Sequence, residues 1–133
     1  MKNKVIKLLI ILILAFNSAI ILYSDEVDIK TTEINILENG ELLTGNKGFN
    51  IISSNNIEIT GDEFSYNKTI QELKAKGNIK IVDKLKEIKI NSEFVEYKKK
   101  EEEFFLKGNA IVYYEDNYTL FGKDIIYLKN ENK

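Results

Sequence analysis

Acidic side chains that recur at matching places in the chain are the first candidates for chemistry. Four acids, Asp62, Glu63, Glu93 and Asp124, lie close to a small residue in three related stretches. Neighbouring carboxylates can act as a general acid and base, and they can bind calcium. A position that returns in every copy of a repeated unit usually serves the architecture of the repeat. We therefore interpret these acids as structural residues and not as catalysts.

The residue types that are missing exclude several other chemistries. The 133-residue chain contains no Cys, His, Pro, Trp or Arg. Without Cys or His it lacks the usual zinc and copper ligands, disulfides and the nucleophile arrangements that need His. Without Arg, bidentate recognition of phosphate or guanine is absent. We expect no enzyme activity, no cofactor and no metal site.

The most charged stretch of the chain is YKKKEEE, residues 97–103. Its six charges largely neutralise one another, so we expect a solvated hairpin tip. A binding patch for phosphates or calcium is the alternative. The whole chain has a net charge of −2, and a mildly acidic protein without Arg is a poor match for nucleic acid.

Strands must position these residues, because alternation is the dominant pattern of the chain. Apolar residues two positions apart occur in Ile57–Ile59, Ile79–Ile81 and Ile88–Ile90, which is the period of a half-buried strand. Turn-type clusters such as ENGE, TGNKG, SSNN and VDKLKE separate the alternating segments. Residues 68–76 have good helix propensity. Their apolar positions continue the strand alternation, however, so we expect a strand there.

The chain repeats itself about every 31 residues. Three stretches align at spacings of 31 and 30 residues: ITGDEFSY (59–66), INSEFVEY (90–97) and LFGKDIIY (120–127). The phrase KGN also recurs, in KAKGN (74–78) and FLKGN (105–109). Each unit contains two or more short strands, and a repeat of this length indicates a stacked, solenoid-like architecture.

Four glycines mark the predicted corners of these strands. Gly61 and Gly122 lie where the parity of the apolar residues changes, which suggests a bulge or a sharp bend. Gly77 and Gly108, in the two KGN phrases, are interpreted in the same way, because glycine and asparagine tolerate positive φ. We expect a strand to pass from one sheet to another at each of these positions.

The first 24 residues are predicted to lie outside the fold. Lys2, Lys4 and Lys7 precede an uncharged run of 16 residues, Leu8–Tyr23, which is the composition of a secretory signal. The run is a little shorter than the roughly 20 residues that a membrane-spanning helix needs. We expect a cleaved signal peptide, with a retained membrane anchor as the alternative, followed by one domain over residues 25–133.

The repeated stretches resemble a known family. The runs GDEFSYNKTIQELKAKGNIKIVD and NSEFVEYKKKEEEFFLKGNAIVYY are similar to the OstA-like family of lipopolysaccharide-transport proteins. This family comprises LptA, LptC and the N-terminal periplasmic region of LptD. The resemblance covers about residues 28–133 and is most specific over residues 59–127. The ending DIIYLKNENK is most similar to an LptD N-terminal region, in which a long barrel would follow.

The resemblance implies an all-β fold, an open twisted β-jellyroll whose apolar interior holds the acyl chains of lipid A. The residues expected to line such a groove are the apolar residues at inward positions of the repeat. They are Ile57, Ile59, Phe64, Tyr66, Leu73, Ala75, Ile79, Ile81, Ile88, Ile90, Val95, Tyr97, Phe104, Leu106, Ala110, Val112, Leu120, Ile125 and Tyr127. The alternative is a closed hydrophobic core, because open and packed apolar faces have the same strand periodicity.

The resemblance also implies a function in lipopolysaccharide transport. The protein would be an exported module of the periplasm, associated with the outer membrane through its partners. Those partners would be lipopolysaccharide and other Lpt proteins, stacked end to end through their edge strands. The alternative is a structural adaptor that docks other envelope proteins and binds no lipid. Lipid crosslinked to the interior would favour the first function, and a protein partner without lipid would favour the second.

Overall fold

The computed structural model describes residues 27–54, 56–115 and 117–129. The predicted signal peptide or anchor, residues 1–24, lies outside the described residues. The strands are β1 (Val27–Thr31), β2 (Asn35–Leu37), β3 (Leu42–Gly45), β4 (Phe49–Ser53), β5 (Ile57–Gly61), β6 (Glu63–Asn67), β7 (Glu72–Asp83), β8 (Ile88–Lys98), β9 (Glu103–Tyr114) and β10 (Tyr118–Leu128). A short 3-10 turn, η1 (Glu38–Gly40), joins β2 to β3.

In residues 68–76, which have both good helix propensity and strand alternation, the structure contains no helix and follows the alternation. Residues 68–71 form a turn, and residues 72–76 begin β7 with alternating burial, so the expected strand is confirmed from Glu72 onward. Over the ranges that the structure covers, no helix has the length and apolar character to cross a membrane.

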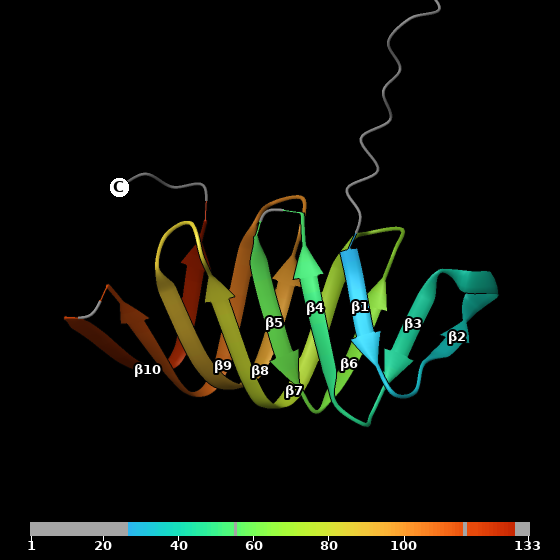
Figure 1. The fold of residues 1–133 in the computed structure, drawn as a ribbon, viewed down its shortest axis with the longest axis horizontal. Coiled ribbons are helices and arrows are strands. Elements are labelled where there is room, and N and C mark those ends of the chain that lie inside the picture. Colours follow the sequence, from blue (N-terminus) through green and yellow to red (C-terminus); the bar gives the residue numbers. More distant parts are fainter. Residues whose placement is uncertain (1–26, 55, 116, 130–133) are drawn as a thin grey trace, which may run out of the picture.

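The ten strands form one antiparallel sheet that is folded over on itself (Figure 1). The long strands β7, β8, β9 and β10 pair in sequence order. Before β7, pairs of short strands follow the same path. β5 pairs with residues 80–83 of β7 and β6 pairs with residues 72–76, so β5 and β6 act as two halves of one interrupted strand. β4 pairs with β5, and β1 pairs with β4 at the edge of the sheet. In the same way β3 pairs with β6, and β2 pairs with β3 at the edge.

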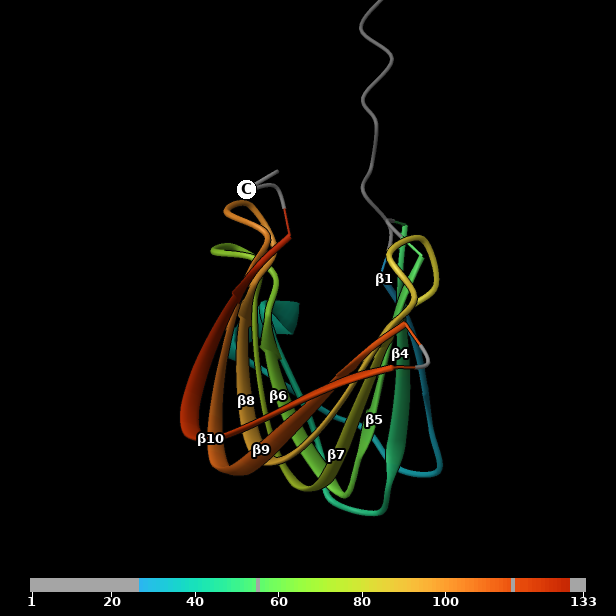
Figure 2. The same ribbon diagram turned by 90° about the vertical axis from the view of Figure 1, so that its left-hand side faces the viewer.

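The fold gives two arms, which we name after their edge strands. The β1 arm contains β1, β4, β5 and residues 79–83, 88–92, 110–114 and 118–122 of the long strands. The β2 arm contains β2, β3, β6 and residues 72–76, 94–98, 103–107 and 124–128. Figure 2 shows the arms diverging from a shared bend in a V-shaped profile. The margin opposite the bend, where the strands of both arms end in turns, is called the mouth.

Aligned irregularities in neighbouring strands produce the bend. The pairing register shifts between Lys76 and Ile79, between Asn91 and Phe94, and between Gly122 and Asp124. A register shift leaves residues unpaired on one strand and bends it locally. Because the shifts line up across the sheet, the whole sheet folds along one line. After two long strands the chain returns to the same arm and runs in the same direction. β7 begins at residue 72 and β9 at residue 103. The distance between these two starts is the 31-residue period of the sequence.

The sheet remains open, with β1 and β2 at one end and β10 at the other. The predicted all-β fold, an open β-jellyroll built from antiparallel strand repeats, is therefore confirmed. The stretch TGNKG separates β3 from β4, as expected of a turn-type cluster. Residues 46–48 carry the chain from β3 in one arm to β4 in the other, and these strands pair with β6 and β5 instead of with each other.

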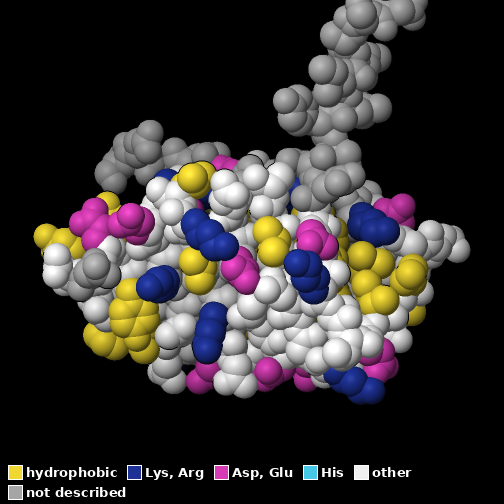
Figure 3. Space-filling model, in the orientation of Figure 1, with side chains coloured by type: hydrophobic (Ala, Val, Ile, Leu, Met, Phe, Trp, Pro, Cys, Tyr) yellow, Lys and Arg dark blue, Asp and Glu magenta, His cyan; other side chains and the backbone are white. Residues whose placement is uncertain are grey.

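Charged side chains of both signs cover the outer faces of the arms. Lys74 Nζ lies 2.8 Å from Glu72 Oε1, and Lys76 Nζ lies 2.9 Å from Glu63 Oε2. Figure 3 shows lysines and acids interspersed over one face of the molecule, with acids along its lower margin. Exposed pairs of this kind each contribute at most about 1 kcal/mol. The fold therefore depends mainly on the apolar side chains between the arms.

Candidate functional site

Apolar side chains from both arms line the space between them. Fifteen of the nineteen residues expected to line a groove are buried there, in one continuous cluster. The β1 arm contributes Ile57 and Ile81, for example, and the β2 arm contributes Val95 and Leu106. Strand alternation turns every second residue of each strand towards the opposite arm. The side chains of the two arms consequently pack against one another.

The other four expected residues lie on β9 and β10. Val112, Ile125 and Tyr127 are half-buried against the cluster, and Leu120 is 58% exposed. β10 is the last strand of the described sheet, so no further strand in the structure covers these side chains. The apolar interior is packed from β3 to β9 and becomes accessible at its β10 end.

Three further residues belong to the same cluster and were not expected there. Leu43, Phe49 and Ile51 are buried, and the ring of Phe49 lies 5.3 Å from the ring of Phe64 in the opposite arm. The alternation in FNIIS, residues 49–53, would have indicated Phe49 and Ile51. The expectation missed them because it relied on copies of the repeat that begin later in the chain.

The mouth is polar, whereas the depth of the interior is apolar. The buried polar residues at the mouth are Ser53 and Asp83 in the β1 arm and Lys99 and Lys129 at the end of the β2 arm. Lys99 corrects one expectation, because it belongs to the YKKKEEE stretch expected to be a solvated tip and is only 4% exposed. The hairpin itself is present, since β8 and β9 pair on either side of it.

Tyrosines occupy equivalent inward positions of the β2 arm, next to the mouth. They are Tyr66, Tyr97 and Tyr127, and each is the last inward-facing residue of its strand. The ring of Tyr97 stacks on Phe104 at 4.1 Å, and Phe104 lies 5.5 Å from the ring of Tyr127. A tyrosine has an apolar body and a polar tip, which suits the boundary between the apolar depth and the polar mouth.

Two polar contacts cross the mouth between the arms. The Tyr127 hydroxyl donates to Asp83 Oδ2 at 3.0 Å, and the Lys86 ammonium donates to the main-chain carbonyl of Lys129. Lys86 Nζ also lies 5.9 Å from the centroid of the Tyr127 ring. Burial, reinforced by the Asp83 carboxylate, raises the pKa of Tyr127 well above its usual range. We call Asp83, Lys86, Tyr127 and Lys129 the clasp.

The corner at Gly77 combines a left-handed backbone with a close side chain. Gly77 has φ of +79° and Asn78 has φ of +50°. The Asn78 side-chain amide donates to Asp62 Oδ2 at 2.8 Å, and the Asp62 amide donates to the Gly77 carbonyl at 3.0 Å. A Cβ on Gly77 would lie 2.5 Å from Asp62 Oδ2. Asp62 therefore acts as a structural partner of this corner.

The next repeat builds the same corner from Glu93, Gly108 and Asn109. Gly108 has φ of +77°, and a Cβ there would lie 2.5 Å from Glu93 Oε2. The Asn109 amide donates to Glu93 Oε1 at 3.3 Å. Within the ranges described, no three acidic residues come together in a group that could hold a metal ion.

Gly61 and Gly122 have a different requirement from the other two glycines. Neither has positive φ. A Cβ on Gly61 would lie 2.5 Å from Ile79 Cδ1, and one on Gly122 would lie 2.7 Å from Ile125 Cγ1. These glycines leave room for apolar side chains of the interior at the bend.

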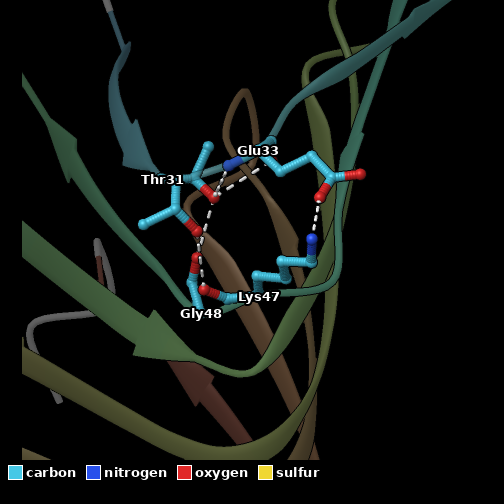
Figure 4. Close-up of polar contacts among 5 residues, drawn as sticks. Thr31, Glu33, Lys47 and Gly48 are labelled. Carbon is cyan, nitrogen blue, oxygen red and sulfur yellow. Dashed lines mark hydrogen bonds and ion pairs between the residues drawn. The ribbon is translucent and has the colours of Figure 1, made fainter.

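The first corner of the sheet is fixed by side chains (Figure 4). The Thr31 hydroxyl lies 2.8 Å from the Gly48 carbonyl and 3.1 Å from the Glu33 carbonyl. Lys47 Nζ lies 2.5 Å from Glu33 Oε2. These contacts tie the connection between β1 and β2 to the connection between β3 and β4, so the bend extends to this end of the sheet.

Both ends of the sheet expose apolar side chains. On β10, Phe121 is 71% exposed, and Leu120 and Ile126 are also exposed. At the other end Ile36 and Leu37 of β2 are exposed. An edge strand has unpaired N–H and C=O groups and is a template for another strand. Apolar residues on such an edge favour addition of a partner strand.

The arrangement as a whole suits a molecule with long apolar chains and a polar head. The chains would find an apolar interior, and the head would find the polar mouth. A model of the family described as LptA/(LptD N-terminal domain) LPS transport protein matches residues 17–133. A search of curated proteins gave no match. Since the family match spans the whole bent sheet, the resemblance in the repeated stretches is confirmed, and the chain belongs to the LptA/LptD N-terminal domain family of lipopolysaccharide transport proteins.

Proposed function

We propose that this protein binds the acyl chains of lipid A between its two arms and passes lipopolysaccharide towards the outer membrane. It would act as one segment of a periplasmic bridge, and as a carrier it needs no catalytic residues. The observation that supports this most strongly is the distribution of side chains in the interior. Both arms turn apolar residues inward, and the buried charged residues of the described chain, Asp83, Lys99 and Lys129, lie at the mouth.

The energy of acyl-chain burial is large enough to drive such binding. Each methylene group removed from water contributes about 0.8 kcal/mol, so a chain of about ten methylenes would contribute on the order of 8 kcal/mol. The lipid would have to replace the contacts that the arms make with each other, because the interior side chains pack together. The net affinity is therefore smaller than this figure, and binding requires the arms to separate.

The polar head of the lipid would remain at the mouth. The ammonium groups of lysines near the mouth can neutralise phosphates as point charges, without the geometric selectivity of arginine. The acyl chains would run inward past the tyrosines Tyr66, Tyr97 and Tyr127. This orientation places each part of the lipid against side chains of matching polarity.

The two open ends of the sheet would join neighbouring segments. The partners would be other Lpt proteins, docked by strand addition at β10 and at the β1 and β2 end. In this proposal residues 1–24 direct export or anchor the chain, and residues 25–133 form the jellyroll in the periplasm. Association with the outer membrane would come through the partners or through a retained N-terminal segment.

A competition experiment with the purified protein tests lipid binding. The protein is incubated with labelled lipopolysaccharide, and unlabelled lipid A or deacylated lipopolysaccharide is added as a competitor. We expect lipid A to displace the label and the deacylated form to fail, because the acyl chains provide the binding energy. Equal competition by the deacylated form would contradict an acyl-chain site. No binding of lipopolysaccharide, together with tight binding of an envelope protein, would favour the structural adaptor.

A further inference from the structure

The clasp joins the arms at one place along the mouth. Asp83 ends β7 and Lys86 lies in the turn after it, whereas Tyr127 lies near the end of β10 and Lys129 directly follows that strand. The Tyr127 hydroxyl bond to Asp83 and the Lys86 bond to the Lys129 carbonyl both run from one arm to the other. They lie at the β10 end of the interior, where Leu120 is exposed and the apolar side chains become accessible.

We propose that the clasp is a gate that must open before an acyl chain can pass between the arms at the β10 end. This inference rests on the proposed function and adds a step that regulates lipid entry. The interior is packed from β3 to β9, so a lipid has access only where the arms can part. A clasp across that place sets the rate of lipid uptake.

The two bonds of the clasp differ in what can break them. Asp83 is only 1% exposed, and its Oδ1 also accepts the backbone amides of Leu85 at 3.0 Å and Lys86 at 3.1 Å. These bonds hold the carboxylate in place for Tyr127. The Lys86 ammonium, in contrast, is bound to a neutral carbonyl. A phosphate is a stronger partner for an ammonium than a carbonyl is, so a phosphorylated glycolipid at the mouth would draw Lys86 away and release one bond.

Two conservative variants weaken the gate without removing its surroundings. Tyr127→Phe removes the hydroxyl and keeps the ring against Phe104, and Asp83 keeps its two backbone amides. Lys86→Met removes the ammonium and keeps most of the apolar stem. We expect each variant to take up fluorescent lipid A about tenfold faster in stopped-flow measurements, which corresponds to about 1.4 kcal/mol. Tyr118→Phe, an exposed tyrosine of β10 outside the clasp, is the matched control and should leave the rate unchanged.

A covalent lock tests the gate in the opposite direction. The chain contains no Cys, so Lys86→Cys and Lys129→Cys introduce the only thiols. A cleavable reagent that bridges two thiols then ties the arms together. Lys98→Cys with Glu103→Cys is the control, because these residues are cross-strand neighbours within the β2 arm. We expect the bridged clasp variant to lose lipid A uptake at least tenfold and to recover it when the bridge is cleaved, while the control keeps its rate.

The outcomes separate the gate from the lipid site. If the bridged clasp variant takes up lipid A as fast as the cleaved one, the gate is wrong and the lipid site stands. If Tyr127→Phe and Lys86→Met match the unmodified protein, the gate is also wrong. If neither the unmodified protein nor any variant binds lipid A, the proposed function and the gate fall together.

Discussion

Replacing Gly77 by alanine tests how the corners of the sheet are built, because two separate energetic costs arise at this position. The backbone φ of +79° is unfavourable for any residue with a Cβ, and the new Cβ would lie 2.5 Å from Asp62 Oδ2. Gly40 offers a control with the first cost alone. Its φ is +98°, and a Cβ there meets no atom within 4 Å.

The structure sets the expected magnitudes. A left-handed backbone costs a residue with a Cβ about 1–2 kcal/mol, and the loss of glycine's freedom in the unfolded chain returns about 0.4–1 kcal/mol. Gly40→Ala should therefore lower the free energy of unfolding by about 0–1.6 kcal/mol. At Gly77 the Asp62 side chain must also rotate away and lose its bond from Asn78, which adds about 1–2 kcal/mol. The total for Gly77→Ala is about 1–3.6 kcal/mol.

Urea unfolding, followed by the fluorescence of the seven tyrosines, measures these differences directly. The chain has no Trp to obscure the signal. Gly77→Ala is also made together with Asp62→Ala, where we expect its cost to fall to that of Gly40→Ala. If Gly77→Ala costs no more than Gly40→Ala, or if removal of the Asp62 carboxylate leaves its cost unchanged, Asp62 does not restrict this corner.

Three other predictions concern the core, the clasp and the edge. Leu106→Ala, deep in the cluster, should lower the free energy of unfolding by about 2–5 kcal/mol, whereas exposed Ile126→Ala should change it by less than about 0.5 kcal/mol; equal losses in urea would contradict the packing. Tyr127 has a raised pKa, so above pH about 10 an unfolded tyrosine releases its proton first. Stability should therefore fall with rising pH, and Tyr127→Phe should flatten that fall in urea titrations. Phe121→Lys on the edge strand should lower self-association in sedimentation, and an unchanged distribution would argue against docking at β10.

The inward-facing residues could be predicted because two regularities coincide. Period-two alternation fixes which side of a strand a residue faces, and the 31-residue repeat carries the same assignment from one hairpin to the next. Ile59 and Ile90 occupy matching places in two repeats, and both are buried. Both regularities are local, so a single sequence contains them.

Contacts between distant segments could not be predicted in this way. The Tyr127–Asp83 bond joins residues 44 positions apart, and no short-range pattern specifies that pairing. Lys99 shows the same limit, because a lysine in a charged run has the same sequence signal whether it points into water or towards the mouth. The TGNKG stretch is a third case, since the same residues that favour a hairpin turn also favour a corner between arms.

The distinction between a groove and a closed core also lies beyond strand periodicity. Ile90 and Leu120 occupy matching inward positions in successive copies of the repeat, but Ile90 is buried and Leu120 is exposed. The difference arises from neighbouring strands, since β8 has a partner on both sides and β10 pairs only with β9 among the described strands. Accessibility of the interior is thus a property of the sheet's end and not of the residue type.

Site-specific photo-crosslinking in cells that make lipopolysaccharide shows whether lipid lies between the arms. A photoreactive residue is placed at Ile81, which faces the interior, and in a second variant at its neighbour Val82, which faces outward on the same strand. Val112 and Tyr113 form the equivalent pair on β9. We expect lipopolysaccharide adducts from Ile81 and Val112 and none from Val82 and Tyr113. A folded protein that gives no adduct at either interior position, or equal adducts from both faces, would contradict a lipid site between the arms.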